Sequence, residues 1–196
     1  MLKKVPSRNG HFVLESGYHT DRWFTLDGLF ENPSVVAPLV TELAERLASY
    51  RTAIVCGPLL GGAFLAQLLA VELGVRFAYT EPVPGSSSGR SATDSLFGAS
   101  YRLPMALQDS VRGESVAVVD DVVSAGSSVR ASVGSLVRAG ATPTVVGSLA
   151  VLGTSALDHF AERGIAVETL ERQDFELWEP AECALCRAGV KLEDPR

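Results

Sequence analysis

The segment from Ser115 to Ala141, SVAVVDDVVSAGSSVRASVGSLVRAGA, constrains the fold more than any other part of the chain. It begins with small and β-branched apolar residues typical of a buried strand, which end at two adjacent carboxylates, Asp120 and Asp121. A loop of serine and glycine follows, and apolar residues then recur at helical spacing. A strand, a loop and a helix in this order are the building unit of α/β proteins with parallel sheets.

Strand-like and helix-like segments alternate along the rest of the chain. The predicted strands are residues 52–56, 75–80, 97–103, 115–119, 144–151 and 165–170. The predicted helices are residues 33–50, 61–74, 127–138 and 155–163. We therefore expect one α/β domain over residues 1–196, with a mostly parallel central sheet flanked by helices on both faces.

Composition excludes several classes of function. The net charge is -6 and no long basic run occurs, which argues against a nucleic-acid-binding surface. No apolar stretch approaches the ~20 residues that a membrane-spanning helix needs, and the N-terminus lacks the apolar segment of a secretory signal. Three cysteines do not make a disulfide framework. We expect a soluble, cytoplasmic protein with reduced thiols and no membrane partner.

The double-aspartate segment has the features of a ligand site. Ligands of open parallel sheets bind beyond the carboxyl ends of the strands. Here a loop that can wrap a phosphate follows the strand, namely Ser124, Ala125, Gly126, Ser127 and Ser128. Asp120 and Asp121 would repel that phosphate, but they suit ribose hydroxyls or a divalent cation. The triphosphate motif G-x-x-x-x-G-K-[ST] is absent, so we expect a phosphorylated ribose. The alternative is that the aspartates only end the strand and cap the next helix.

These residues also carry a resemblance to a known family. VAVVDDVVSAGSSV resembles the phosphoribosyl pyrophosphate (PRPP) binding motif of type I phosphoribosyltransferases. Residues 10–24 are similar to the N-terminal segment of orotate phosphoribosyltransferases, and residues 54–70 to their pyrophosphate-loop region. The closing segment WEPAECALCRAG also resembles the tail of some bacterial members. The resemblance thus runs over most of the chain, in order.

The resemblance implies an architecture and a reaction. An N-terminal hood, residues 1–32, would cover the base, with a mobile loop at 81–96 and a tail at 178–196. The reaction would be the Mg²⁺-dependent transfer of ribose-5-phosphate from PRPP to a nitrogenous base with release of pyrophosphate, as in pyrimidine biosynthesis. The resemblance also implies a homodimer in which the mobile loop of one subunit closes over the site of its partner.

The resemblance further implies which residues form the site. Asp120 and Asp121 would bind PRPP, approach Mg²⁺ and favour the positive charge that develops at the anomeric carbon. The other PRPP-binding residues would be Val122, Ser124, Ala125, Gly126, Ser127, Ser128, Gly57, Pro58, Leu59, Leu60, Gly61, Gly62 and Glu81. Without the resemblance, residues 57–62 would be interpreted as a tight turn between a strand and a helix. The base would contact Phe12, Tyr18, His19, Trp23 and Phe24, unless these side chains only pack the hood against the core.

The cations expected for pyrophosphate and orotate are mostly missing. Residues 82–95 contain no lysine and one arginine, Arg90, so Arg102 is the best candidate for a catalytic cation and Arg90 the second. Glu15 stands where the family usually has a basic residue, and Leu152 and Gly153 replace an Asp-Arg pair that would bind the orotate carboxylate. An unpaired buried carboxylate is costly. Arg22 or His19 could take that role, although nothing in the sequence places them there.

Two questions stay open on sequence grounds. The lysine-poor loop favours an alternative function, a PRPP-binding or nucleotide-binding sensor or regulator with weak or no turnover. The second question concerns Cys183 and Cys186, which form a single C-x-x-C. A zinc site usually needs four ligands, which two such pairs in a close dimer contact would supply. The other interpretation is that the two thiols are structural or incidental.

Overall fold

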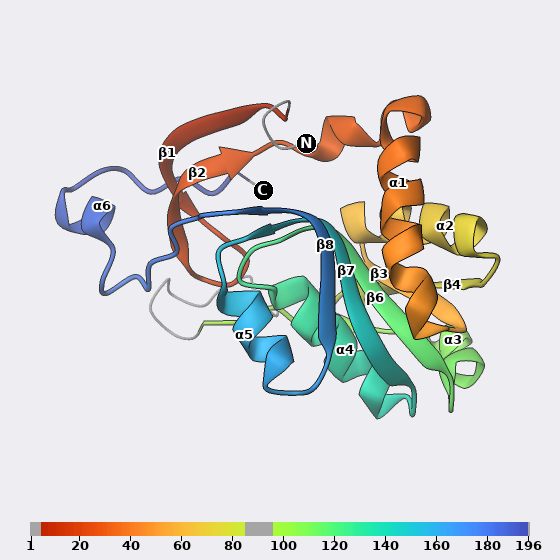
Figure 1. Cartoon of the computed structure of the whole chain (residues 1–196). Helices are drawn as coiled ribbons and strands as arrows, with labels where there is room; N and C mark the ends of the chain where they lie inside the picture. Colours follow the sequence, from red (N-terminus) through yellow and green to blue (C-terminus); the bar gives the residue numbers. More distant parts are fainter. Residues whose placement is uncertain (1–4, 85–95, 196) are drawn as a thin grey trace.

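The computed structural model describes residues 5–84 and 96–195, which form an α/β fold around a six-stranded sheet (Figure 1). The strands are ordered β5-β4-β3-β6-β7-β8. They are β3 (Ile54–Pro58), β4 (Arg76–Pro82), β5 (Tyr101–Arg102), β6 (Ser115–Val123), β7 (Thr142–Leu152) and β8 (Ala166–Gln173). The short edge strand β5 is antiparallel to β4, and all other neighbours in the sheet are parallel. The predicted fold class is confirmed.

Helices cover both faces of the sheet (Figure 1). One face packs against α1 (Pro33–Leu47) and α2 (Gly61–Leu73), and the other against α3 (Met105–Val111), α4 (Ser127–Arg138) and α5 (Ser155–Ala161). Two 3₁₀ turns, η2 (Asp27–Leu29) and η3 (Ala48–Tyr50), flank α1. Successive side chains of β6 point to opposite faces, so Val116 and Val118 join one core cluster while Ala117 and Val119 join the other. The continuous apolar run of β6 follows from this burial on both faces.

A separate two-stranded hairpin and the C-terminal tail lie together (Figure 1). The hairpin consists of β1 (Ser7–Val13) and β2 (His19–Phe24), paired antiparallel. The tail contains the short helix α6 (Ala184–Arg187) and reaches both edges of the hairpin. Trp178 exchanges two backbone hydrogen bonds with His19, and Glu193 bonds through its backbone to β1. The hairpin corresponds to the expected hood, and the tail holds it from both sides.

Two local predictions are corrected. β6 does not end at residue 119 but continues to Val123, because Asp120 and Val122 pair with Ser148 and Ala150 of β7. The predicted strand at 97–103 shrinks to β5, and the chain then forms α3, which was not predicted. α3 has only seven residues, too few for helical periodicity to stand out in the sequence. Residues 85–95 of the expected mobile loop, Arg90 included, lie outside the described residues.

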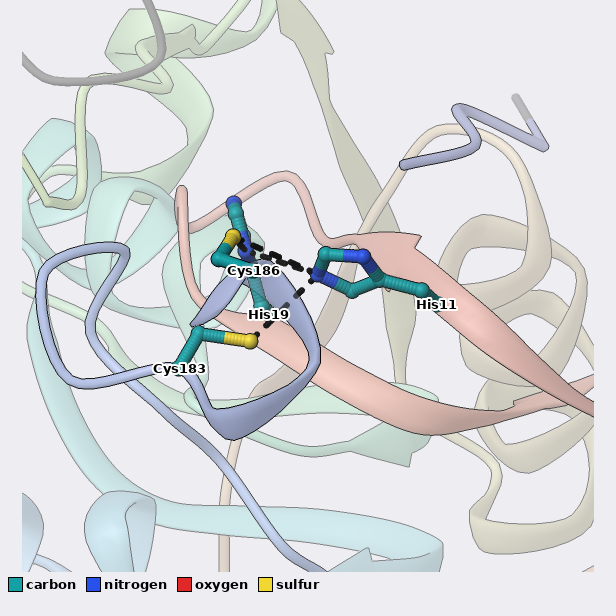
Figure 2. Close-up of side chains that lie close together, drawn as sticks. All are labelled: His11, His19, Cys183 and Cys186. Atoms are coloured by element: carbon teal, nitrogen blue, oxygen red, sulfur yellow. Dashed lines mark hydrogen bonds between the residues drawn. The ribbon is translucent and has the colours of Figure 1, made fainter. Parts of the chain in front are cut away.

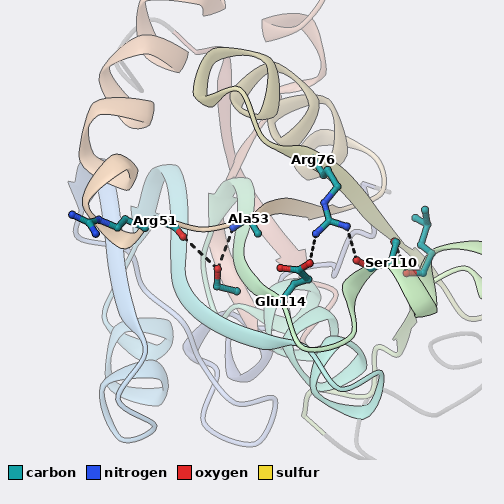
Figure 3. A network of polar contacts seen from close by, with 7 residues as sticks. Arg51, Ala53, Arg76, Ser110 and Glu114 are labelled. Atoms are coloured by element: carbon teal, nitrogen blue, oxygen red, sulfur yellow. Dashed lines mark hydrogen bonds and ion pairs between the residues drawn. The ribbon is translucent and has the colours of Figure 1, made fainter.

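The amino ends of the strands are joined by polar contacts (Figure 3). Ser115 accepts backbone hydrogen bonds from Ala53, and Arg76 forms a 2.7 Å ion pair with Glu114. These contacts lie at the end of the sheet opposite the double aspartate, so they stabilise the scaffold without entering the site. In the two described ranges, no helix combines the length and the apolar character that crossing a membrane requires.

Candidate functional site

The two aspartates lie at the carboxyl end of β6 and are held by short hydrogen bonds. Ser128 Oγ donates to Asp120 Oδ2 at 2.7 Å, and the Asp121 backbone N–H donates to Asp120 Oδ1 at 3.1 Å. Asp121 Oδ1 accepts the Val122 N–H at 2.8 Å. Burial first, and the neighbouring charge of Asp121 second, raise the pKa of Asp120 well above its usual range. A cation or a hydroxyl donor at this place would stabilise the charged carboxylates.

The glycines that open α2 pack directly against the two carboxylates. A Cβ atom on Gly61 would lie 2.4 Å from Asp121 Oδ2, and one on Gly62 would lie 2.6 Å from Asp120 Oδ1. Gly57 in β3 is equally confined, because its Cβ would lie 2.0 Å from the Gly62 carbonyl oxygen. The expected pyrophosphate loop and the double aspartate are therefore brought together, although about 60 residues separate them in the sequence. Pro58 is buried in β3, and the Leu59–Leu60 peptide bond is cis.

The loop after β6 leads into the N-terminus of α4. Gly126 has φ 81°, a conformation that favours glycine, and α4 begins at Ser127. The first backbone N–H groups of a helix have no acceptor within the helix, so this loop and helix start can bind an anion. Ala125 is buried and contributes only backbone, and the Ser128 hydroxyl is engaged by Asp120. The predicted phosphate loop therefore offers backbone donors and the hydroxyls of its other two serines.

A cavity of about 280 Å³ lies between this loop and the hairpin. The hairpin and its turn contribute Leu14, Glu15, Ser16, Arg22, Trp23, Phe24 and Leu26. The sheet side contributes Asp121, Val122, Val123, Ser124, Gly126, Ser127, Ser128, Leu152 and Phe175. Among these described lining residues, Arg22 carries the one positive charge, and Glu15 and Asp121 carry carboxylates. The cavity thus combines aromatic surface, a cation and the double-aspartate loop.

The predicted base-binding residues divide into two groups. Trp23 and Phe24 line the cavity, and their contact with a base stays a prediction. Phe12 and His19 are 0% and 1% exposed and do not line the cavity, so their contact with a base stays a prediction that this cavity does not support. Tyr18 packs edge-on against Phe97, with ring centroids 5.8 Å apart, and is also absent from the lining. Burial, with a smaller contribution from His11, lowers the pKa of His19.

Arg102 and Glu81 pair with each other away from the cavity. They face each other across β4 and β5, and Arg102 Nε lies 2.9 Å from Glu81 Oε1. Neither residue lines the cavity, and the Arg102 side chain is 62% exposed. Their roles in catalysis and PRPP binding stay predictions.

Comparison with known proteins agrees with this geometry. Residues 28–181 match the family model described as the phosphoribosyl transferase domain. The chain belongs to the phosphoribosyltransferase family. As the resemblance implied, it is an enzyme of this family, and its reaction is phosphoribosyl transfer.

Individual family members are similar over most of their length. Orotate phosphoribosyltransferase from Thermotoga maritima is 32% identical over 200 residues, which cover 100% of this chain and 97% of the relative. The crystal structure of orotate phosphoribosyltransferase from Aeropyrum pernix aligns with a TM-score of 0.61 at 25% identity, covering 85% of this chain and 87% of that one. Adenine phosphoribosyltransferase from Thermoanaerobacter pseudethanolicus shares the fold, with a TM-score of 0.60, 21% identity and coverage of 78% and 88%.

Several cavity residues were not assigned from the sequence. The sequence offers Arg22 only as a possible substitute cation, and it indicates no role for Phe175 or Leu26. Arg22 directly precedes the predicted aromatic pair in β2, but alternation along a short strand does not indicate which face meets a ligand. Glu15 and Leu152, noted as departures from the family pattern, both line the cavity.

Proposed function

We propose that this phosphoribosyltransferase transfers ribose-5-phosphate from PRPP to orotate and releases pyrophosphate. The observation that carries the proposal is the cavity in which Arg22, Trp23 and Phe24 face the double-aspartate loop. Orotate is a planar pyrimidine with a carboxylate, so it suits aromatic walls and one cation. The name of the full-length relative from Thermotoga maritima supports the same base.

Each part of the site has a role in this proposal. Backbone N–H groups of residues 124–128 and the start of α4 bind the 5′-phosphate. Asp120 and Asp121 accept hydrogen bonds from the ribose hydroxyls and favour the positive charge that develops at the anomeric carbon. Arg22 pairs with the orotate carboxylate. It takes the role of the arginine in the family's Asp-Arg pair, whose positions Leu152 and Gly153 occupy here. The hairpin excludes water from the reacting centre.

Mg²⁺ belongs to the proposal on the chemistry of the donor set. Carboxylate oxygens are the ligands that Mg²⁺ prefers. Burial first, and the charge of Asp121 second, disfavour the charged form of Asp120 and raise its pKa, and a cation beside the two carboxylates would offset both effects. Asp121, which lines the cavity, and Asp120 behind it would hold the ion directly or through water. When bound, Mg²⁺ neutralises charge on the pyrophosphate leaving group.

We also propose a homodimer. α2 and the neighbouring strand β4 carry exposed large apolar side chains, among them Phe64, Val71 and Phe77. Exposed apolar side chains gathered on adjacent elements are typical of a subunit interface.

The decisive experiment measures pyrophosphate release by the full chain with PRPP and Mg²⁺. Orotate, uracil, xanthine, hypoxanthine, guanine and adenine would be supplied singly. Release with orotate alone is expected. Pyrophosphate release only with another base would overturn the choice of orotate. No pyrophosphate release with any base, although calorimetry detects PRPP binding, would favour the sensor or regulator alternative.

A further inference from the structure

Four metal-binding side chains from the two ends of the chain meet beside the hairpin (Figure 2). They are His11 on β1, His19 on β2, Cys183 directly before α6 and Cys186 within it. One ligand atom from each lies within 4.8 Å of all the others. We propose that these residues bind one Zn²⁺ in a tetrahedral Cys₂His₂ site that fixes the C-terminal tail to the hairpin.

The distances between the ligand atoms fit a tetrahedron around Zn²⁺. Bond lengths of ~2.0–2.1 Å to nitrogen and ~2.3 Å to sulfur give edges of ~3.3 Å to ~3.8 Å between ligand atoms. His11 Nε2 lies 3.1 Å from His19 Nδ1 and 3.4 Å from Cys183 Sγ. Cys186 Sγ lies 3.7 Å from His11 Nε2 and 3.3 Å from His19 Nδ1. These four edges therefore already approach those of an occupied site.

Hydrogen bonding alone does not satisfy this arrangement. The other ring nitrogen of His11, Nδ1, lies 2.8 Å from the Val190 carbonyl oxygen and donates to it. In the neutral ring, Nε2 is then an acceptor with one lone pair. Three groups nevertheless converge on this single nitrogen, as the dashed lines in Figure 2 show. A central cation takes one lone pair from each of the four atoms and removes the conflict.

The surroundings match a structural rather than a catalytic metal. Four protein ligands close the coordination sphere and leave no position for a substrate. The bond from His11 to the Val190 carbonyl orients the ring, as such outer contacts do in metal sites. His11, His19 and Cys183 are buried, whereas Cys186 is exposed and provides the entry path. Binding releases the two thiol protons, and Zn²⁺ keeps its oxidation state.

The site would complete the attachment of the tail. Backbone hydrogen bonds already join Trp178 to His19 and Glu193 to β1, on either side of the cluster. Zn²⁺ would join the segment between them to both strands of the same hairpin. Because this hairpin forms one wall of the cavity, the metal would support the cavity without contacting it.

Metal content tests the proposal on the full chain, purified without a metal-binding tag. We expect about one zinc per chain by elemental analysis. Replacement by Co²⁺ should give the visible absorption of tetrahedral cobalt with thiolate ligands, which requires no variant. Absence of zinc, together with failure to take up Zn²⁺ or Co²⁺ after reduction, would overturn the proposal. The proposal would also be overturned if Cys183 and Cys186 form a disulfide in the purified protein and the reduced thiols bind no metal.

Variants locate the site. Cys183→Ser with Cys186→Ser should abolish zinc binding and lower Tm by roughly 10 °C. Cys56→Ala, at the buried cysteine of β3, is the matched control and should keep full zinc content. An unchanged zinc content in the double variant would contradict the assignment. If that variant does not fold, chelation of the wild-type protein should speed hydrogen exchange at Val13, His19, Trp178 and Glu193, and unchanged exchange would count against the proposed attachment.

Discussion

Gly61 at the start of α2 lies against Asp121 at the end of β6, so closely that a Cβ atom on Gly61 would be 2.4 Å from Asp121 Oδ2. The carboxylate of Asp121 therefore has a fixed neighbour in the loop that we propose to bind pyrophosphate. Any side chain at position 61 must displace either α2 or Asp121.

The contact predicts the effect of Gly61→Ala. We expect kcat/KM for PRPP to fall about 10-fold or more, because Asp121 loses its position. Steady-state kinetics with varied PRPP would measure this. Gly28→Ala is the control, since a Cβ there meets nothing within 4 Å. Equal kinetics of the two variants would refute the role given to the contact.

Arg22 should determine the preference for a carboxylated base. Arg22→Gln removes the one cation among the described cavity residues, and we expect KM for orotate to rise roughly 10- to 100-fold. KM for PRPP should change little. Arg138→Gln, on the exposed end of α4, is the control for loss of an arginine. An unchanged orotate KM in Arg22→Gln would place the base carboxylate elsewhere.

His159 should make stability depend on pH. Burial first, and then the charges of Arg130 and Arg163, lower its pKa from 6.5 to about 4, with Glu162 opposing. Between these values the unfolded chain binds more protons than the folded one, so stability falls as pH falls from 6.5 to about 4. In His159→Gln this contribution disappears. The loss in free energy of unfolding between pH 7.5 and pH 5, measured by urea unfolding, should therefore be ~1 kcal/mol smaller in the variant than in the wild type. Parallel pH profiles of the two proteins would contradict the assignment.

A buried hydroxyl pair joins β4 to α4. Thr80 Oγ1 and Ser132 Oγ lie 2.6 Å apart, and both residues are fully buried. Ser132→Ala should lower the free energy of unfolding by ~1–3 kcal/mol, because the Thr80 hydroxyl loses its partner. Thr80→Val should lower the free energy of unfolding less in the Ser132→Ala variant than in the wild-type protein, because the partner hydroxyl is already absent. Urea unfolding of the wild type, the two single variants and the double variant measures the coupling between the two hydroxyls. Strictly additive effects on the free energy of unfolding would exclude this coupling.

The proposed homodimer can be tested through α2. Phe64→Glu places a charge on an exposed apolar side chain, and sedimentation should then show a single chain where the wild type shows two. Met105→Glu, on α3 against the other face of the sheet, is the control and should stay dimeric. A wild type that sediments as one chain would overturn the proposal.

The sequence by itself determined the parallel α/β core and the strand, loop and helix that carry the double aspartate. Both depend on neighbours in the chain: alternating segments define the layers, and a strand, two aspartates, a Ser-Gly loop and a helix lie within one stretch. The edge region was harder to predict, because β5 and α3 are too short for periodicity to indicate them.

Only the tertiary structure decided what gathers around these segments. Gly61 and Gly62 reach the aspartates because β3 and β6 are adjacent in the sheet, an order that the sequence does not state. His19 was predicted to meet the base, yet it lies beside His11 and the tail cysteines, because hairpin and tail pair through their backbones. Contacts between positions 172 residues apart, such as His11 and Cys183, depend on how the whole chain returns on itself, and no local pattern encodes that path.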